Sequence, residues 1–426
     1  MTTLDVSVPR MARLGRLVPG LLRENVPFRR FFAGQAVSLV GDQVSGIALP
    51  LVGVLVLHAG AAEMGYLTTA GLLPNLLLSL HAGAWVDKRG RRRQTMLLAD
   101  VGRAMLLASV PIAYAFDALT LAQLYVVSAL IGALSVFFYV SYSTLFTSLV
   151  PRKHYVEANS LLNGSRALSF VGGPSLGGLI VQVQSAPAAL VVDAFSFVAS
   201  AFALGRISPA EPPTEPAERG HLKAGWMFIR RTPMIWASLL ATSTINFFNF
   251  VFFALFILYA TRSLHVQPGL LGVVLGAGAI GGVLGSIVTG RVGRRIGIGR
   301  AFALGCFVFP ASLLLVPLAG GPRWVVLGCL FLAEFGAGVG VMLLDISSGS
   351  ITQALVPDRL RSRVAGAYMV VNYGVRPIGA FLGGVLGAEL GLRPTLWIAT
   401  IGGVAGVLWV LPSPIFRLHD LPEQAE

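Results

Sequence analysis

The segment 83–93 reads GAWVDKRGRRR and separates two long apolar runs of the sequence. It fits the pattern G-x-x-x-D-[R/K]-x-G-R-[R/K]-[R/K] at every defined position, with Gly83, Asp87, Lys88, Gly90, Arg91, Arg92 and Arg93. Lys and Arg close to the ends of membrane spans are retained on the cytoplasmic side. The segment therefore predicts a short cytoplasmic loop between two transmembrane helices.

The composition of the whole chain agrees with a membrane protein. Of its 426 residues, 55% are apolar and only 12% are charged, against a charged share of about 25% in soluble domains. The apolar runs are continuous, whereas the strands of a membrane barrel alternate every second residue. We therefore expect an all-α integral membrane protein.

Apolar stretches long enough to cross a bilayer, about 20 residues each, occur twelve times. They span residues 31–57, 64–86, 95–116, 120–147, 160–183, 187–206, 234–259, 269–290, 300–318, 324–350, 364–390 and 394–411. The long connection between the sixth and seventh spans is rich in Pro and Glu, a composition that cannot form a core. The chain thus divides into two six-helix bundles.

The predicted organisation has five parts. A cytoplasmic N-terminal segment with a surface helix covers 1–30, and the first bundle covers 31–206. A cytoplasmic linker covers 207–233, in which 225–231 reads as a short amphipathic helix on the membrane surface. The second bundle covers 234–412, and a cytoplasmic tail covers 413–426.

The charges support this topology. With both termini in the cytoplasm, 26 of the 32 basic residues fall in inside segments. Three lie in outside loops (Arg262, Arg323 and Arg393) and three are embedded in spans (Arg103, Arg166 and Arg376). We therefore expect a multi-pass protein of the cell (inner or plasma) membrane, whose net charge of +13 attracts anionic membrane lipid and not nucleic acid.

The two predicted bundles are related in sequence. At an offset of 206 residues, 149–151 (Leu-Val-Pro) falls on 355–357, and Gly173, Leu176, Gly177 and Gly178 fall on Gly379, Leu382, Gly383 and Gly384. A parallel repeat of this kind places a substrate cavity at the bundle interface, reached alternately from either side as the bundles rock. Transport is the predicted consequence.

The loop 83–93 resembles the cytoplasmic loop motif of the major facilitator superfamily, and 290–295 (GRVGRR) resembles a decayed copy with glycine in place of the aspartate. The resemblance implies a latch, in which Asp87 faces the positive N-terminus of a helix from the other bundle and arginines hold it and bind lipid phosphate. The alternative is a loop that only fixes topology. That alternative explains the arginines but not Asp87 and the two glycines.

Within that superfamily the chain is similar to the drug/proton antiporter branch that includes macrolide efflux and enterobactin-exporter-like proteins. The similarity runs from about residue 25 to 412 and rests on local segments: 28–30 with 41–42, 100–103, 193–195, 230–233 and 356–361. Gly173, Pro174, Gly177 and Gly178 resemble the end of the exporter motif of span five, which shapes a bend between helices. Ser160 and Ser169 stand where that motif has glycine, and Ser128 where other proton antiporters have arginine, so the transport direction and the proton relay stay open.

Asp42 is the most informative embedded charge, because a charged side chain at mid-membrane costs at least about 2.5 to 3.5 kcal/mol. It stands about 11 residues into the first span, roughly 16 Å deep, between Gly41 and Gly46. We predict that it carries the coupled proton as hydration alternates between the two sides. A structural pair with an embedded arginine is the alternative.

Other embedded charges are weaker candidates for coupling. Glu334 lies at a similar depth from the outside, and Arg376 is predicted to reach it, either as a neutral structural pair or as part of proton coupling. Asp100 and Arg103, three residues apart on one helix face, are expected to neutralise each other. We expect Asp345 and Arg166 at inner gates or packing positions, and Asp193 near the outer end of its span, within reach of water.

The cavity is expected to be lined by aromatic and amide side chains, which suit a bulky lipophilic substrate better than a sugar. The candidates are Gln43, Tyr139, Tyr142, Asn246, Asn249 and Tyr373.

Two segments match enzyme motifs, but their positions in the sequence argue against enzymatic function. The G-x-G-x-x-G match at 276–281 and the G-x-S-x-G match at 173–177 both lie inside apolar spans. Neither a phosphate loop nor a zinc H-E-x-x-H sequence is present, and Cys306 and Cys329 lie in apolar runs. We expect no enzyme activity, no cofactor and no metal.

The sequence therefore predicts a monomeric secondary transporter that exports a lipophilic small molecule, such as a drug, antibiotic or siderophore-like metabolite, in exchange for protons. An importer or a lysophospholipid flippase of the same fold is the first alternative. A non-transporting membrane sensor or enzyme is the second.

Overall fold

The computed structural model describes residues 19–208 and 222–421, and in these ranges the chain is helical throughout its regular structure. After the short α2 (Gly20–Glu24), the N-terminal bundle consists of α3 (Val26–Leu51) with its π-helical extension η1 (Val52–Val56), α4 (Ala61–Arg89), α5 (Arg92–Ala115), α6 (Leu121–Leu149), α7 (Tyr155–Val183) and α8 (Ala186–Gly205). The single turn η2 (Arg152–His154) leads into α7. The predicted surface helix of 1–30 lies mostly outside the described residues.

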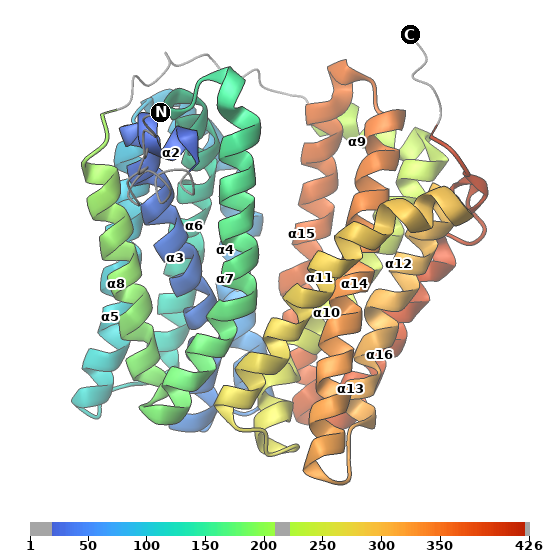
Figure 1. Cartoon of the computed structure of the whole chain (residues 1–426). Coiled ribbons are helices and arrows are strands. Elements are labelled where there is room, and N and C mark those ends of the chain that lie inside the picture. The colour runs from blue at the N-terminus through green and yellow to red at the C-terminus, as the bar shows by residue number, and fades with distance from the viewer. Residues whose placement is uncertain (1–18, 209–221, 422–426) are drawn as a thin grey trace, which may run out of the picture.

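The C-terminal bundle follows α9 (Leu222–Arg231). It consists of α10 (Pro233–Arg262), α11 (Pro268–Ile296), α12 (Ile298–Leu313) with α13 (Leu315–Leu318), α14 (Arg323–Leu355), α15 (Asp358–Glu389) and α16 (Leu392–Ala405) with η3 (Gly406–Trp409). The turn η4 (Pro414–Arg417) is the last regular element of the described residues. Figure 1 places α2, α9 and the C-terminal end at the same end of the molecule, here called the termini face, and the other end is the opposite face.

Local sequence signals set where the helices begin and end. Asn25 accepts a hydrogen bond from the amide of Phe28 at 2.9 Å and so caps α3, while its own amide group donates to the carbonyl of Leu149. Ser185 caps α8 in the same way. Such side chains satisfy amides that a helix leaves without partners. Gly90 ends α4 with φ 64°, a left-handed conformation that favours glycine.

The two bundles repeat the same helix pairings. In the N-terminal bundle α3 packs on α7 and α8, α6 packs on α4 and α5, and α5 packs on α8. The C-terminal bundle has the equivalent contacts: α10 with α15 and α16, α14 with α11 and α12, and α12 with α16. The internal repeat seen in the sequence is therefore a repeat of packing.

The prediction of twelve spans in two bundles is confirmed, since each predicted span coincides with a helix or a helix and its extension. Ten helices of the described residues are long and apolar enough to cross a membrane by length and composition alone. The other two of the twelve are α4 and α7. Both contact the opposite bundle, α4 on α15 and α7 on α11, and an interface helix does not need an apolar surface all round.

The bundles approach each other most closely in the half nearest the opposite face. Gly65 of α4 lies so close to Gly384 of α15 that a methyl group on either would overlap backbone atoms of the other helix. The rings of Tyr66 and Phe381 stack across this contact with centroids 5.6 Å apart. Gly178 and Gly272 make the equivalent approach between α7 and α11.

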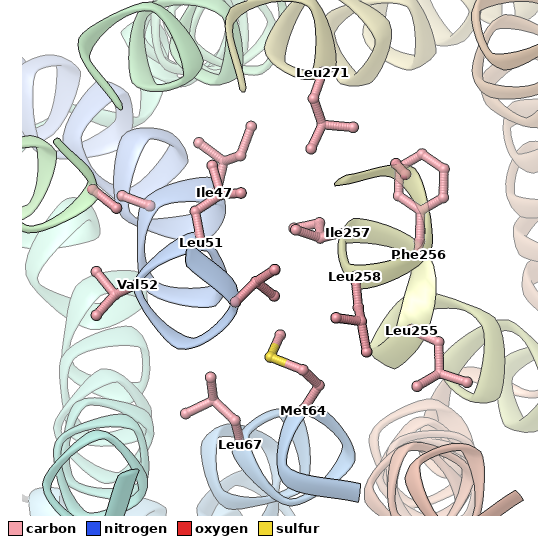
Figure 2. Close-up of a cluster of buried hydrophobic side chains, with 14 of the residues drawn as sticks. Ile47, Leu51, Val52, Met64, Leu67, Leu255, Phe256, Ile257, Leu258 and Leu271 are labelled. Carbon is pink, nitrogen blue, oxygen red and sulfur yellow. The ribbon is translucent and has the colours of Figure 1, made fainter. Parts of the chain in front are cut away.

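An apolar cluster seals the bundles together at the opposite face. Figure 2 shows Leu51, Met64 and Leu67 of the N-terminal bundle pointing toward Ile257 and Leu258 of α10. All five are nearly inaccessible to solvent. Toward the termini face the bundles diverge (Figure 1), and added side chains at Gly83 of α4 and Gly164 of α7 would meet open space. The protein is thus closed at the opposite face and open toward the termini.

Helix α9 forms within the predicted linker, whose residues 209–221 lie outside the described structure. Its buried face packs on α15, where Gly225 fits against the backbone at Arg363. Ile229 is fully buried, and Trp226 packs edge-on against Trp236 of α10. The amphipathic segment predicted at 225–231 is therefore a helix docked on the C-terminal bundle, and its basic face stays exposed.

Candidate functional site

A small pocket opens inside the N-terminal bundle between α3, α6 and α7. Its lining combines one carboxylate, one guanidinium and two phenols with apolar groups, and consists of Gln35, Ser38, Leu39, Asp42, Phe138, Tyr139, Tyr142, Leu162 and Arg166. The space within it that the centre of a water molecule can reach measures about 20 Å³, enough for an ordered water. The pocket can therefore hydrate Asp42 in this conformation.

Asp42 reaches this pocket because of its position on α3. Residues 35, 38, 39 and 42 share the face of the helix that lines the pocket. On the neighbouring face Gly41 packs against α8, and a side chain there would collide with the carboxylate of Asp193 and the hydroxyl of Ser196. Asp42 itself is half-buried, with Arg166 and Tyr139 at the pocket wall.

Asp193 does not lie where the sequence predicted. It was expected near the outer end of its span within reach of water, but its side chain is only 1% exposed. It faces α3 at Gly41 and accepts a hydrogen bond of 2.7 Å from Ser196. Its burial comes from a glycine on a different helix, and the spacing along α8 carries no sign of it.

Asp100 and Arg103 form the expected ion pair within α5. Both side chains are buried, at 0% and 1% exposure. The guanidinium lies between the rings of Phe138 and Phe197, 4.4 and 4.2 Å from their centroids. Two aromatic faces and a carboxylate thus hold Arg103 in a fixed place, and it also interacts electrostatically with Asp42 and Asp193.

The predicted approach of Arg376 to Glu334 is not made. Among the described residues Arg376 stacks on Tyr373, with 3.9 Å to the ring centroid, and on Phe250, with 5.3 Å. Its electrostatic partner is Asp345, an exposed residue of α14. The Glu334 carboxylate instead lies against Gly278 of α11. Glu334 therefore lies on the side of α14 that packs on α11, whereas Arg376 belongs to α15.

The predicted cavity residues fall into different places. Tyr139 and Tyr142 line the pocket with Asp42, and Tyr373 is partly exposed beneath Arg376. Gln43 packs on Gly173 of α7, and the amide that lines the pocket belongs to Gln35. Gln35 was not predicted as a pocket residue, although its distance of seven residues from Asp42 places it on the same helix face.

The two asparagines of α10 lie away from this pocket. Asn246 donates a hydrogen bond to the carbonyl of Thr242 in its own helix at 3.0 Å. Asn249 lines a smaller apolar pocket between α10, α12 and α16. The two asparagines therefore do not line one common cavity, as the sequence had predicted.

The basic segment 83–93 was predicted as a loop, but only residues 90 and 91 lie outside helices, because α4 continues to Arg89 and α5 begins at Arg92. Its side chains make structural contacts within their own bundle. Arg93 donates hydrogen bonds of 2.9 Å to the carbonyls of Leu204 and Gly205 and thereby caps the C-terminus of α8. Arg89 stacks on Trp85, Arg92 is buried, and Lys88 and Arg91 are exposed. The side chain of Asp87 lies outside the described part of the structure, so the latch stays a prediction.

The glycine motif of α7 seats that helix on two neighbours. Gly173 packs on Gln43 and Gly177 on Ile47, both of α3, while Gly178 packs on α11. The repeat in α15 has the same function, with Gly379 on Phe247 and Gly383 on Val251 of α10. Side chains larger than hydrogen would force these helices apart.

Comparison with known proteins agrees with this architecture. The family model described as Major Facilitator Superfamily matches residues 31–380, which include both bundles. The chain belongs to this superfamily. Its fold class and the resemblance inferred from the loop 83–93 are confirmed, and the superfamily consists of membrane transporters.

Characterised and uncharacterised relatives match over most of the chain. The multidrug efflux pump Tap of Mycobacterium tuberculosis (strain ATCC 25618 / H37Rv) is 29% identical over 412 residues, covering 91% of this chain and 93% of Tap. The MFS-type transporter YfiS of Bacillus subtilis (strain 168), which is uncharacterized, is 27% identical over 386 residues, covering 87% and 89%.

Solved transporter structures share the fold. A bacterial homologue of the iron transporter ferroportin in an inward-facing state superposes with a TM-score of 0.72 and 18% identity, covering 92% of this chain and 99% of that one. The nucleoside transporter NupG gives a TM-score of 0.72 with 12% identity, covering 91% and 99%. At these identities the likeness concerns the fold alone.

Proposed function

We propose that this superfamily member is a proton-coupled efflux transporter of lipophilic small molecules, with the termini face in the cytoplasm of the cell membrane. The observation that carries the proposal is Asp42, a carboxylate in mid-membrane beside a pocket large enough for water. A carboxylate in that place can bind a proton in one state and release it in the other, because hydration changes as the bundles rock. The name of the Tap relatives, multidrug efflux pump, supports the direction.

The proposed cycle uses the conformation described above as the cytoplasm-open state. Substrate enters between the bundles from the termini face as the proton leaves Asp42 to the cytoplasm. The bundles then rock, the apolar cluster at the opposite face separates, and a proton from outside displaces the substrate. Tyr139, Tyr142 and Tyr373 supply aromatic surface for a lipophilic cargo. The protein acts as a monomer without cofactor or enzymatic chemistry.

Everted membrane vesicles test this proposal, because their cytoplasmic face is exposed to the medium. Respiration acidifies the lumen, and we expect ethidium or a radiolabelled macrolide added outside to accumulate in the lumen. Lumenal pH should rise at the same time, since each transport cycle returns a proton to the medium. Asp42→Asn should abolish accumulation, whereas Asp117→Asn, the same change in the exposed loop between α5 and α6, should leave it intact.

The alternatives give different results in the same vesicles. Uptake into the lumen without proton movement would contradict antiport. Movement of a fluorescent lysophospholipid between leaflets, with no accumulation of either drug, would indicate a flippase. Unchanged transport by Asp42→Asn would remove that residue from the mechanism.

A further inference from the structure

The interior of the N-terminal bundle contains an unusual number of charges for a membrane protein. Three carboxylates, those of Asp42, Asp100 and Asp193, come from three different helices, α3, α5 and α8. Two guanidiniums accompany them: Arg103 from α5 interacts electrostatically with Asp42, and Arg166 from α7 lines the same pocket as Asp42. The remaining titratable groups toward this cluster are the phenols of Tyr139 and Tyr142 on α6, which are neutral at physiological pH.

The balance of these charges is uneven. With every carboxylate ionised the cluster carries three negative and two positive charges. Arg103 is already committed to Asp100 by an ion pair, and Arg166 lies at the exposed side of the pocket beside Asp42. Asp193 lies in the dry interior, where Ser196 donates a hydrogen bond to it and Arg103, already paired with Asp100, is its nearest described cation. Two like charges close together in a poorly solvated site cannot both ionise without a large cost.

We infer that Asp42 and Asp193 form one proton-binding pair across Gly41. A single proton on this pair neutralises the cluster of three carboxylates and two guanidiniums. This inference rests on the proposed proton coupling and extends it, since it assigns Asp193 a function and makes the site a pair of carboxylates. Gly41 is the structural requirement, because the absence of a side chain there lets the Asp193 carboxylate rest against α3 next to Asp42.

The pair gives the proton a route between a wet and a dry position. Asp42 contacts the water-sized space of the pocket, while Asp193 is sealed from it. In the conformation open to the termini face, a proton leaves through Asp42, and the bond broken is an O–H bond of the pair whose electrons stay on the carboxylate. The mobile proton passes to water, and no other reactant is needed.

Infrared spectroscopy of the purified protein in detergent tests the pair without any substrate. At neutral pH the wild type should show a C=O stretching component from a protonated carboxyl group. Asp193→Asn and Asp42→Asn should each lose that component, because either change leaves two carboxylates facing two guanidiniums. The exposed control Asp117→Asn should keep it. If Asp193→Asn does not fold, Asp193→Ser supplies the same loss of charge with a smaller side chain.

The outcomes separate this inference from the proposed function. A component that persists in Asp193→Asn, or in Asp193→Ser, would overturn the pair. In everted vesicles, loss of coupled transport in both Asp42→Asn and Asp193→Asn would support it. Loss in Asp42→Asn together with wild-type transport in Asp193→Asn would reject the pair while leaving the proposed antiport intact, and wild-type transport in both would reject both ideas.

Discussion

Arg103 connects the charged residues inside the N-terminal bundle. It forms an ion pair with Asp100, stacks between Phe138 and Phe197, and interacts electrostatically with Asp42 and Asp193. Asp100 is fully buried, and Arg103 supplies its counter-charge. The removal of this one cation therefore affects both stability and the charge of the proposed proton site.

Arg103→Met should destabilise the protein by about 3 to 5 kcal/mol, because it leaves Asp100 buried without a counter-charge. Chemical unfolding in detergent, followed by intrinsic fluorescence, measures the change. Adding Asp100→Asn to Arg103→Met should recover part of the loss. Arg359→Met, the same substitution at an exposed position of α15, should change stability by no more than about 0.5 kcal/mol, and an equal loss in both variants would contradict a specific function for the pair.

The sequence predicted some of these residues and missed others for a physical reason. A charge inside an apolar span is visible in one dimension, so Asp42 and the Asp100–Arg103 spacing could be identified. The environment of Asp193 depends on Gly41 of another helix, and the choice between Gln35 and Gln43 depends on which face of α3 meets α7. To predict the partners of Arg376, one would likewise need to know how α14 and α15 are rotated relative to each other. Contacts between helices lie beyond a single-sequence pattern.

At the scale of elements, close contacts between glycines determine how the bundles meet. The pair Gly65 and Gly384 brings α4 and α15 together near the opposite face, and Gly178 with Gly272 does the same for α7 and α11. The positions of the helices could be predicted from the lengths of the apolar runs, and the glycine repeat from residue identity. The helix on which each glycine packs could not be predicted from the sequence.

Gly65→Leu should prevent closure at the opposite face, since its side chain would overlap the backbone of α15. Cross-linking between cysteines placed at positions 66 and 381, in a background lacking Cys306 and Cys329, reports on this contact, where the native rings stack at 5.6 Å. We expect at least a tenfold slower cross-linking rate in Gly65→Leu. Gly46→Ala, at a position with open space around it, is the matched control, and equal rates in the two variants would contradict the proposed steric block.

At the scale of the whole molecule, the two bundles have similar helix packing but differ in the charges that they bury. Gly173 packs on Gln43 and Gly379 packs on Phe247, which makes Asn246 the counterpart of Asp42. Asn246 is neutral and satisfied by its own helix. The proposed proton site therefore belongs to one bundle only.

Moving the carboxylate to the other bundle should not restore function. The double variant Asp42→Asn with Asn246→Asp should transport no better than Asp42→Asn alone, because the second bundle lacks the Asp100, Arg103 and Asp193 environment. Proton-driven dye accumulation in everted vesicles measures this. Rescue to more than about half of wild-type transport would show that the position in one bundle is not decisive.

The orientation of the molecule has an independent test. A fluorescent protein fused after residue 421 should be fluorescent, and alkaline phosphatase fused there should be inactive, if the termini face lies in the cytoplasm. Phosphatase inserted in the loop between α13 and α14 should be active. The reverse pattern would contradict the orientation derived from the 26 inside basic residues.

The apolar cluster at the opposite face is built largely of aliphatic and thioether side chains such as Leu51, Met64 and Leu258, together with aromatic ones such as Phe256 (Figure 2). Attraction of this kind is largely entropic near room temperature and weakens on cooling. The balance between the two open states should therefore depend on temperature, with the outward-open population growing in the cold. An organism living at low temperature would need a larger or better packed seal to keep the same resting state.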